Sequence, residues 1–254
     1  MKILLTNDDG IDAEGLQCLF EVLKKKADCF VVAPDQGRSC CSHLVTTGSP
    51  LDISSRPENQ WSVSGTPADC VRVGLMVLEL MPDLVISGVN HGSNLGVDIL
   101  YSGTAAGARE ASLLGIPSIA ISQYMRRDVK RDWAVIARRA EMVLEKLVQQ
   151  ERLGTGFWNV NLPALPSLAT GFDFPISICE PEPQPLSFFF EDAPECVEVE
   201  SESGKNNGPI SIRTVQYKSN YQARARTTGS DVDLCFSGHA TVSWLKSHLV
   251  DLRI

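Results

Sequence analysis

The sequence of 254 residues has no hydrophobic run near the roughly 20 residues that span a bilayer. Its N-terminal apolar run, residues 3–5, is short and is soon followed by two carboxylates, which argues against a signal peptide or an anchor. The eight cysteines are scattered and lack C-x-x-C spacing, so zinc ligation and a disulfide framework are not indicated. We therefore expect a cytoplasmic protein without membrane attachment.

Positive charge is also scarce. The chain has 23 Lys and Arg against 31 Asp and Glu, a net charge of -8 and a pI near 5.1. Proteins that bind nucleic-acid polymers usually present a basic face, because phosphate neutralisation dominates their affinity. The charge balance argues against such a partner, although it is compatible with a local basic pocket for a nucleotide.

Several catalytic signatures are missing from the sequence. It has no G-x-S-x-G elbow, no Walker loop, no H-E-x-x-H and no early G-x-G-x-x-G. The four histidines have no zinc-type spacing, and only His91 lies within a motif, where we expect it to line a pocket. The common serine hydrolase, P-loop, zinc protease and dinucleotide-binding classes are therefore disfavoured.

The first 162 residues alternate short apolar segments with helical patterns. Continuous apolar segments are typical of parallel strands that are buried on both faces by helices. We predict strands at 2–6, 29–33, 84–87, 118–122 and 157–162, and helices at 16–23, 67–80, 104–114 and 132–150. The predicted fold class is α/β, with a Rossmann-like, doubly wound, mostly parallel sheet. Ligands of such sheets bind at the carboxyl ends of the strands.

The second part, residues 163–254, has a different composition, with a proline-rich stretch and short β-like runs. We predict strands at 176–179, 197–200 and 210–215, a loop at 201–209 and a closing helix at 240–252. The chain is thus expected to divide into a catalytic core, 1–162, and a β-rich C-terminal region with hairpins and a terminal helix, 163–254.

Two adjacent aspartates follow the first predicted strand, in Asn7-Asp8-Asp9-Gly10. Adjacent carboxylates repel each other and are costly at a buried strand end unless a cation offsets their charge. A hard divalent ion such as Mg²⁺ or Mn²⁺ prefers oxygen ligands of this kind. An Asx-turn that leads into a helix is the alternative.

A glycine-rich segment, residues 87–96, follows the third predicted strand. Gly88, Gly92 and Gly96 permit close approach of the backbone to a ligand. Asn90 and Asn94 between them supply amide groups for a metal or a phosphate oxygen. Three glycines and two asparagines are more than a simple turn requires.

Three further polar segments follow strands or precede helices. Arg38-Ser39 offers a guanidinium for phosphate and a neutral oxygen for a metal, or is only a polar loop. Ser102-Gly103-Thr104 opens a helix whose free N–H groups form a ready anion site, or simply caps that helix. Pro67 and Asp69 are explained by helix initiation, and for Thr66 a place in the pocket lining stays open.

In these segments the chain closely resembles the SurE family, survival proteins that act as 5′/3′-nucleotidases. The resemblance is carried by LLTNDDGIDAEGL, VVAPDQGRS, GTPADCV, PDLVISGVNHGSNLGVDILYSGTAAGAREA and GIPSIAIS. It spans most of residues 1–122, with fainter echoes at 159–163 and 229–232. Residues 164–228 match poorly.

The resemblance implies one divalent cation per subunit, Mg²⁺ or Mn²⁺, held by Asp8, Asp9, Ser39 and Asn90. It also implies a nucleotide substrate, whose phosphate we assign to Asn7, Asn94, Ser102, Gly103 and Thr104. It further implies a homodimer or homotetramer that exchanges a C-terminal hairpin between subunits.

The expected reaction is hydrolysis of nucleoside 5′- and 3′-monophosphates by a metal-bound water. Asp8 and Asp9 are the catalytic candidates, and the sequence leaves open which of them accepts a proton. Three alternatives stay open: other small phosphoesters or polyphosphate as substrates, covalent catalysis by Asp8, and a nucleotide-binding regulator without turnover. Aspartyl-phosphate enzymes usually separate their two carboxylates by one residue, so adjacency favours the water mechanism.

Overall fold

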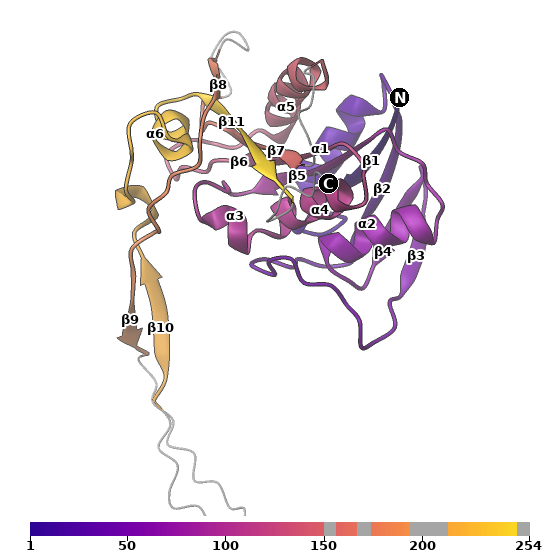
Figure 1. The fold of residues 1–254 in the computed structure, drawn as a ribbon, viewed down its shortest axis with the longest axis horizontal. Coiled ribbons are helices and arrows are strands. Elements are labelled where there is room, and N and C mark those ends of the chain that lie inside the picture. Colours follow the sequence, from indigo (N-terminus) through magenta and orange to yellow (C-terminus); the bar gives the residue numbers. More distant parts are fainter. Residues whose placement is uncertain (150–155, 167–173, 194–212, 248–254) are drawn as a thin grey trace, which may run out of the picture. The chain divides into compact units, whose positions relative to one another are not determined.

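The computed structural model describes residues 1–149, 156–166, 174–193 and 213–247 (Figure 1). Their largest element is a nine-stranded sheet in the order β3-β4-β2-β1-β5-β6-β7-β11-β8. Its strands are β1 (Lys2–Thr6), β2 (Asp28–Pro34), β3 (Ile53–Arg56), β4 (Gln60–Val63), β5 (Leu84–His91), β6 (Ser118–Gln123), β7 (Gly156–Leu162), β8 (Ile176–Ile178) and β11 (Ala240–Lys246). The helices are α1 (Glu14–Leu23), α2 (Pro67–Met76), α3 (Asp98–Tyr101), α4 (Gly103–Leu113), α5 (Trp133–Val148) and α6 (Asp231–Phe236).

The sheet is mostly parallel. Strands β4, β2, β1, β5, β6 and β7 run parallel to one another. At the edges, β3 pairs antiparallel with β4, β11 pairs antiparallel with β7, and β8 runs parallel to β11. The direction of strand addition reverses beside β1, because β2 lies on one side and β5 on the other. This arrangement confirms the predicted Rossmann-like α/β fold class.

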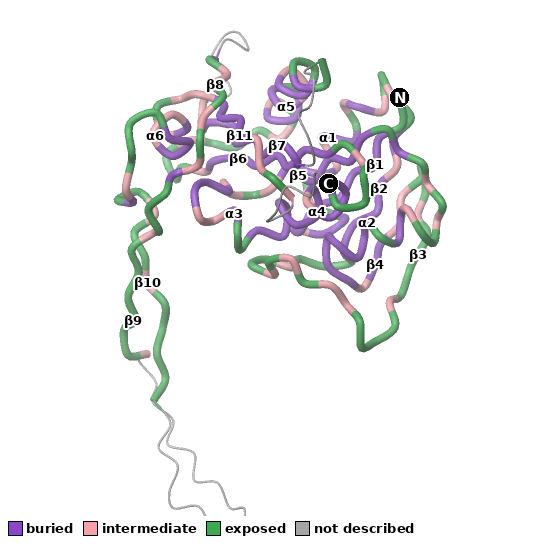
Figure 2. Tube along the Cα trace, in the orientation of Figure 1, coloured by how far each residue is buried: buried purple, intermediate pink, exposed green. Residues whose placement is uncertain are grey.

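Helices cover both faces of the sheet, and each face has its own hydrophobic core (Figure 2). Ile3 and Leu5 of β1 pack in the core that contains residues of α1 and α5. Leu4, between them, faces the core that contains residues of α2. Successive side chains of a strand point to opposite faces, so a strand buried on both sides needs the continuous apolar sequence seen here.

Two predicted elements end four residues away from their observed ends. The helix predicted at 67–80 ends at Met76. The strand predicted at 84–87 continues to His91, because a bulge places residues 88 and 89 opposite Ile121 and lets Asn90 pair with Ser122.

The closing helix predicted at 240–252 is wrong. Ala240–Lys246 forms strand β11, which fills the position beside β7 and pairs along its length. Thr241, Val242 and Trp244 are β-favouring residue types, and a ready strand edge in β7 decides the outcome. Residues 248–252 lie outside the described residues, as do the strand predicted at 197–200 and the loop predicted at 201–209.

Contacts group the chain into two compact units, Met1–Pro183 with Arg226–Ile254, and Gln184–Ala225. The second unit contains a separate antiparallel pair, β9 (Phe188–Asp192) and β10 (Val215–Ser219), which confirms the predicted hairpin. Of the strand predicted at 210–215, residue 215 is the first of β10. The division into domains at residue 162 stays a prediction. Within the described ranges, no helix is both long and apolar enough to cross a membrane.

Candidate functional site

The polar motifs gather where β1 and β5 end. These neighbouring parallel strands finish at the same edge of the sheet, in Thr6 and His91. The edge lies where strand order reverses, which is the usual place for a ligand in an open α/β sheet. The sequence prediction that chemistry is concentrated at strand ends agrees with this geometry.

Asp8 is a buried carboxylate held from two sides. Thr104 Oγ1 donates a hydrogen bond of 2.5 Å to Asp8 Oδ1, and the backbone carbonyl of Asp8 accepts one of 2.7 Å from the Arg38 N–H. Burial, opposed by the Thr104 hydrogen bond and reinforced by the charge of Asp9, raises the pKa of Asp8 to about 6. The carboxylate is therefore fixed in place while its charge is poorly compensated.

Asp9 lies against the end of β5. Its Oδ2 accepts a hydrogen bond of 2.9 Å from the His91 N–H. The neighbouring Asn90 donates from Nδ2 to the Gly92 carbonyl at 2.8 Å, which leaves the amide oxygen as its ligating atom. One backbone hydrogen bond thus links the two motifs that the sequence predicted to meet.

The loop after β2 forms the third wall. The Arg38 N–H bond to the Asp8 carbonyl fixes this loop beside the aspartates, and the following residue, Ser39, is exposed. A Cβ built on Gly37 would stand 3.6 Å from the Asp9 carbonyl oxygen, so the two chain segments run in contact. The backbone therefore delivers the predicted ligand Ser39 to the same edge of the sheet.

The donor set suits a hard divalent cation. Among the described residues, no lysine or arginine pairs with Asp8 or Asp9. No group of three or more His, Cys, Asp or Glu side chains that would hold a metal occurs in the described ranges. A cation site here would consist of two carboxylates supplemented by neutral oxygens, such as those of Asn90 and Ser39. Mg²⁺ and Mn²⁺ accept this kind of ligand set.

The N-terminus of α4 closes the site opposite β1. Ser102 caps the helix, with its Oγ accepting a 2.9 Å hydrogen bond from the Ala105 N–H and its own proton still available to donate. A Cβ on Gly103 would stand 2.8 Å from Asp8 Cβ, so only glycine permits this approach. Thr104 uses its hydroxyl proton on Asp8, which makes it a positioning residue for that carboxylate.

Two asparagines predicted to bind phosphate have other partners. Asn7 donates to the Gly10 carbonyl at 2.8 Å, and its buried Oδ1 has no partner among the described residues. Asn94 donates from Nδ2 to Ser122 Oγ at 2.8 Å and from its backbone N–H to Asn161 Oδ1 at 2.8 Å. One N–H of each side-chain amide is therefore engaged within the protein, and phosphate binding by either residue stays a prediction.

The end of the glycine-rich segment is anchored by residues that sequence reasoning left without a role. Asn159 and Asn161 of β7 both donate to the Asn94 carbonyl at 3.0 Å. Buried Asp231, at the start of α6, accepts from the Gly96 N–H at 2.8 Å. The faint resemblance at 159–163 and 229–232 was the only sequence signal for these anchors.

A further ion-pair cluster is centred on buried Glu110 of α4. Glu110 accepts from Arg72 Nε at 2.5 Å and from His43 Nε2 at 2.8 Å, so it links α4 to α2 and to the loop after β2. Burial raises the pKa of Glu110, but the hydrogen bonds from His43 and Arg72 prevail and lower it. Nothing in the local sequence around residue 110 identified this cluster.

Known proteins resemble this chain over most of its length. The model of the family described as "Survival protein SurE" matches residues 3–177. A protein of Synechocystis sp., named provisionally as a 5′-nucleotidase, is 39% identical over 249 residues, which is 97% of this chain and 100% of the relative. The 5′-nucleotidase SurE of Vibrio vulnificus (strain YJ016) is 44% identical over 168 residues, covering 65% of this chain and 64% of that protein.

A solved structure agrees over the whole fold. The crystal structure of the SurE protein from Aquifex aeolicus matches with a TM-score of 0.81 at 30% identity, and covers 99% of this chain and 95% of that one. The structure defines a doubly wound α/β protein with adjacent carboxylates at the end of its first strand. The chain belongs to the SurE family.

Proposed function

We propose that the protein is a divalent-metal-dependent phosphomonoesterase that hydrolyses nucleoside 5′- and 3′-monophosphates to nucleoside and phosphate. The observation that carries this proposal is the meeting of Asp8, Asp9 and Asn90 beside the N-terminus of α4 at the switch point of the sheet. Membership of a family whose relatives are named 5′-nucleotidases supports the choice of substrate.

Asp8, Asp9, Asn90 and Ser39 would hold the cation, which supplies Lewis-acid polarisation of the phosphoryl group and an acidified water. Thr104 keeps the Asp8 carboxylate oriented through its hydrogen bond. The backbone N–H groups at the start of α4 and the Ser102 hydroxyl are preorganised donors. They would stabilise the negative charge that develops on the phosphoryl oxygens. In this proposal the carboxylates at the end of β1 hold the cation, and the start of α4 binds the phosphate.

The first prediction concerns the metal. Release of phosphate from AMP should require added Mg²⁺ or Mn²⁺ and stop when a chelator is added. Without a cation, the carboxylates of Asp8 and Asp9 repel the dianionic phosphate of the substrate. Phosphate release is measured on protein dialysed against chelator, before and after each metal is restored. Full turnover by the metal-free protein would contradict the proposal.

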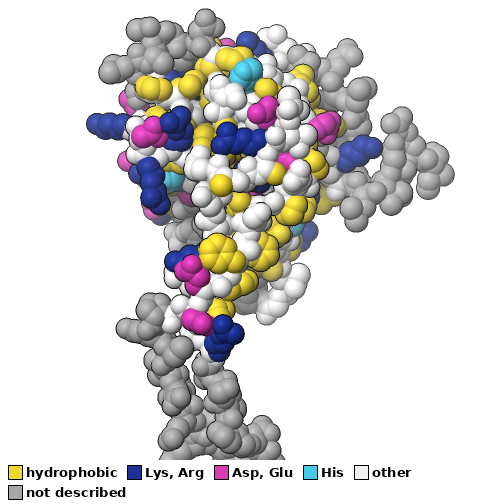
Figure 3. All heavy atoms as spheres, turned by 90° about the vertical axis from the view of Figure 1, so that its left-hand side faces the viewer, with side chains coloured by type: hydrophobic (Ala, Val, Ile, Leu, Met, Phe, Trp, Pro, Cys, Tyr) yellow, Lys and Arg dark blue, Asp and Glu magenta, His cyan; other side chains and the backbone are white. Residues whose placement is uncertain are grey.

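We further propose that the protein assembles as a homodimer or homotetramer through the hairpin β9–β10. Phe188, Phe190 and Tyr217 form an aromatic cluster on it, with ring centroids 5.6–6.2 Å apart. Each side chain is at least half exposed (Phe188 58%, Phe190 58%, Tyr217 50%), and Figure 3 shows hydrophobic side chains on this hairpin. Large apolar patches on a strand pair mark association surfaces.

The second prediction tests that assembly. Phe190→Glu should shift the protein towards a smaller species, since a charge in the middle of an apolar interface remains unpaired when buried. Gln216→Glu is the matched control, because residue 216 is adjacent to Tyr217 and points to the opposite face. Molar mass is measured by light scattering at micromolar concentration, and a wild-type monomer would disprove the assembly.

A further inference from the structure

An open cleft of about 1110 Å³ adjoins the candidate site. It is lined by the start of α1, by His91 at the end of β5, and by the connection from β6 to α5, residues 124–132. That connection, Tyr-Met-Arg-Arg-Asp-Val-Lys-Arg-Asp, contains four of the 23 basic residues of an otherwise acidic chain. The volume of the cleft exceeds what a single phosphate needs and suits a larger part of a substrate.

The cleft is continuous with the site. The His91 backbone N–H donates to Asp9 Oδ2 at 2.9 Å, and the His91 side chain contacts the guanidinium of Arg131 in the cleft wall. The same imidazole packs edge-on against Trp133, with ring centroids 5.7 Å apart. His91 thus lines the cleft and is hydrogen-bonded to Asp9, so the cleft begins beside the candidate site.

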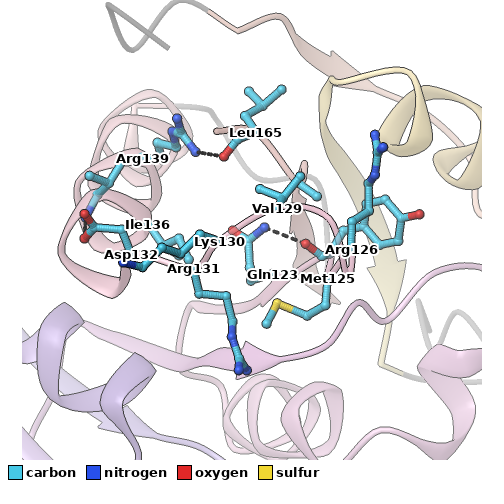
Figure 4. Close-up of a pocket in the computed structure, with 13 residues that line it drawn as sticks. Gln123, Met125, Arg126, Val129, Lys130, Arg131, Asp132, Ile136, Arg139 and Leu165 are labelled. Atoms are coloured by element: carbon cyan, nitrogen blue, oxygen red, sulfur yellow. Dashed lines mark hydrogen bonds between the residues drawn. The ribbon is translucent and has the colours of Figure 1, made fainter. Parts of the chain in front are cut away.

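Hydrogen bonds hold the start of the basic connection, residues 124–132, in place (Figure 4). Gln123 Nε2 donates to the Tyr124 carbonyl at 2.7 Å, and the guanidinium of buried Arg139 donates to the Leu165 carbonyl at 3.1 Å. The cavity of about 20 Å³ between them has room for one water, and Gln123 Oε1 beside it is a buried acceptor without a partner among the described residues. In Figure 4, Arg131 extends away from this cavity.

Three cations of the connection, Arg127, Lys130 and Arg131, have no carboxylate partner among the described residues. Arg126 pairs with Asp128 at 2.6 Å, and Arg131 is engaged with His91. Arg127 and Lys130 are exposed and, in the described part of the chain, form no ion pair.

The acidic residues of the cleft cancel only part of this charge. Asp12 pairs with Arg56. Glu14, in the first turn of α1, and Asp132, which caps α5 by accepting a 3.1 Å hydrogen bond from the Val135 N–H, are the other two carboxylates of the lining. Three cations without a carboxylate partner in the described ranges thus stand against two carboxylates, and the net positive charge favours an anionic group there.

We propose that the cleft binds a second phosphate group of the substrate, through Arg127 and Lys130, and so favours nucleotides that carry two phosphates over monophosphates. This inference rests on the proposed function. In the reaction a water oxygen adds to the phosphorus beside Asp8 and Asp9, and the P–O bond to the leaving group breaks. This bond is a phosphoester in a 3′,5′-bisphosphate and a phosphoanhydride in a nucleoside diphosphate. The proton of the water goes to the leaving oxygen or to solvent, and orthophosphate is released while the rest of the substrate, with its second phosphate, stays bound in the cleft. The second phosphate is either on the other ribose hydroxyl or in a phosphoanhydride.

The experiment compares kcat/KM for adenosine 3′,5′-bisphosphate, ADP and AMP at saturating metal. Wild-type protein should prefer a two-phosphate substrate over AMP by about tenfold or more in kcat/KM. The preference should come mainly from a lower KM, because charged hydrogen bonds to the second phosphate stabilise the ground state and the transition state alike. Preference for the bisphosphate alone identifies a ribose-bound phosphate, and preference for ADP alone identifies a phosphoanhydride. Equal kcat/KM for all three substrates would overturn the inference.

Two double variants test whether Arg127 and Lys130 cause the preference for two-phosphate substrates. The double variant R127Q/K130Q should lose the preference and retain AMP hydrolysis, since neither residue belongs to the metal or phosphate machinery. K25Q/R138Q removes the same charge from exposed positions outside the cleft and should keep the preference. A preference unchanged in R127Q/K130Q would refute the assignment to these residues.

If AMP is not hydrolysed at all, the proposed function fails and the inference is still decided. Calorimetric titration with adenosine 3′,5′-bisphosphate, ADP and AMP then gives dissociation constants for wild type and R127Q/K130Q. Tighter binding of either two-phosphate ligand, lost in the double variant, supports the cleft, and equal constants for all three contradict it.

Discussion

Asp9→Asn is expected to lower kcat/KM for AMP by about a thousandfold, because loss of a ligand charge removes several kcal/mol of transition-state stabilisation. The fold should change little. Asparagine is isosteric, and its side-chain oxygen still accepts the hydrogen bond from the His91 N–H. The variant should also need a higher metal concentration for half-maximal activity, which a metal titration followed by calorimetry and by kinetics measures.

Ser102→Ala is the matched comparison on the phosphate side. It should lower kcat/KM by about ten- to a hundredfold, since one hydrogen bond to a charged group contributes about 1.5–3 kcal/mol. Its metal titration should be unshifted, because Ser102 is bonded to the Ala105 N–H and not to either aspartate. If Ser102→Ala weakened metal binding as much as Asp9→Asn, the separation between metal and phosphate residues would be wrong.

The sequence was sufficient for the parallel core of the fold. Residues 2–6 and 118–122 were predicted as strands and are observed as β1 and β6 to within one residue. The reason is physical: a strand buried on both faces tolerates no polar interruption, so its apolar run identifies it without knowledge of its neighbours. Helix α2 was equally clear at its start, where Thr66 and Asp69 form the capping box.

Elements that depend on distant partners were not predictable. In residues 240–246 the alternation of polar and apolar side chains is too short to distinguish a strand from a helix, and the partner that decides, β7, is about 80 residues away in sequence. The hairpin of β3 and β4 was missed for a related reason, because Ile53–Arg56 is largely exposed and carries no apolar pattern.

The site was predictable as a set of residues but not as a network. Adjacent carboxylates at a strand end identified Asp8 and Asp9 from elementary electrostatics. Sequence could not show how hydrogen-bond donors are shared out, because this depends on contacts between elements. Thr104 donates to Asp8, and Asn94 is bound to Ser122 and Asn161, although the resemblance assigned both residues to phosphate.

Gly88→Ala is expected to give the largest loss of stability. Gly88 has φ of +139°, which side chains other than glycine rarely adopt, and a Cβ there would stand 2.1 Å from the Ile121 carbonyl oxygen. Backbone strain and overpacking each cost about 1–3 kcal/mol, so we expect the free energy of unfolding to fall by about 4 kcal/mol. Since the bulge at residues 88 and 89 also aims Asn90 at the site, the folded fraction should bind metal more weakly.

Gly92→Ala separates the two causes in this last prediction. Gly92 has nearly the same φ, +141°, but a Cβ there meets nothing closer than 3.8 Å, at Asn90 Nδ2. It should therefore show only the backbone cost of about 1–3 kcal/mol. Urea denaturation of wild type and both variants gives the free energies of unfolding. Equal losses for the two variants would mean that β6 moves away from residue 88 at no cost, and that the close contact with Ile121 does not hold the bulge in place.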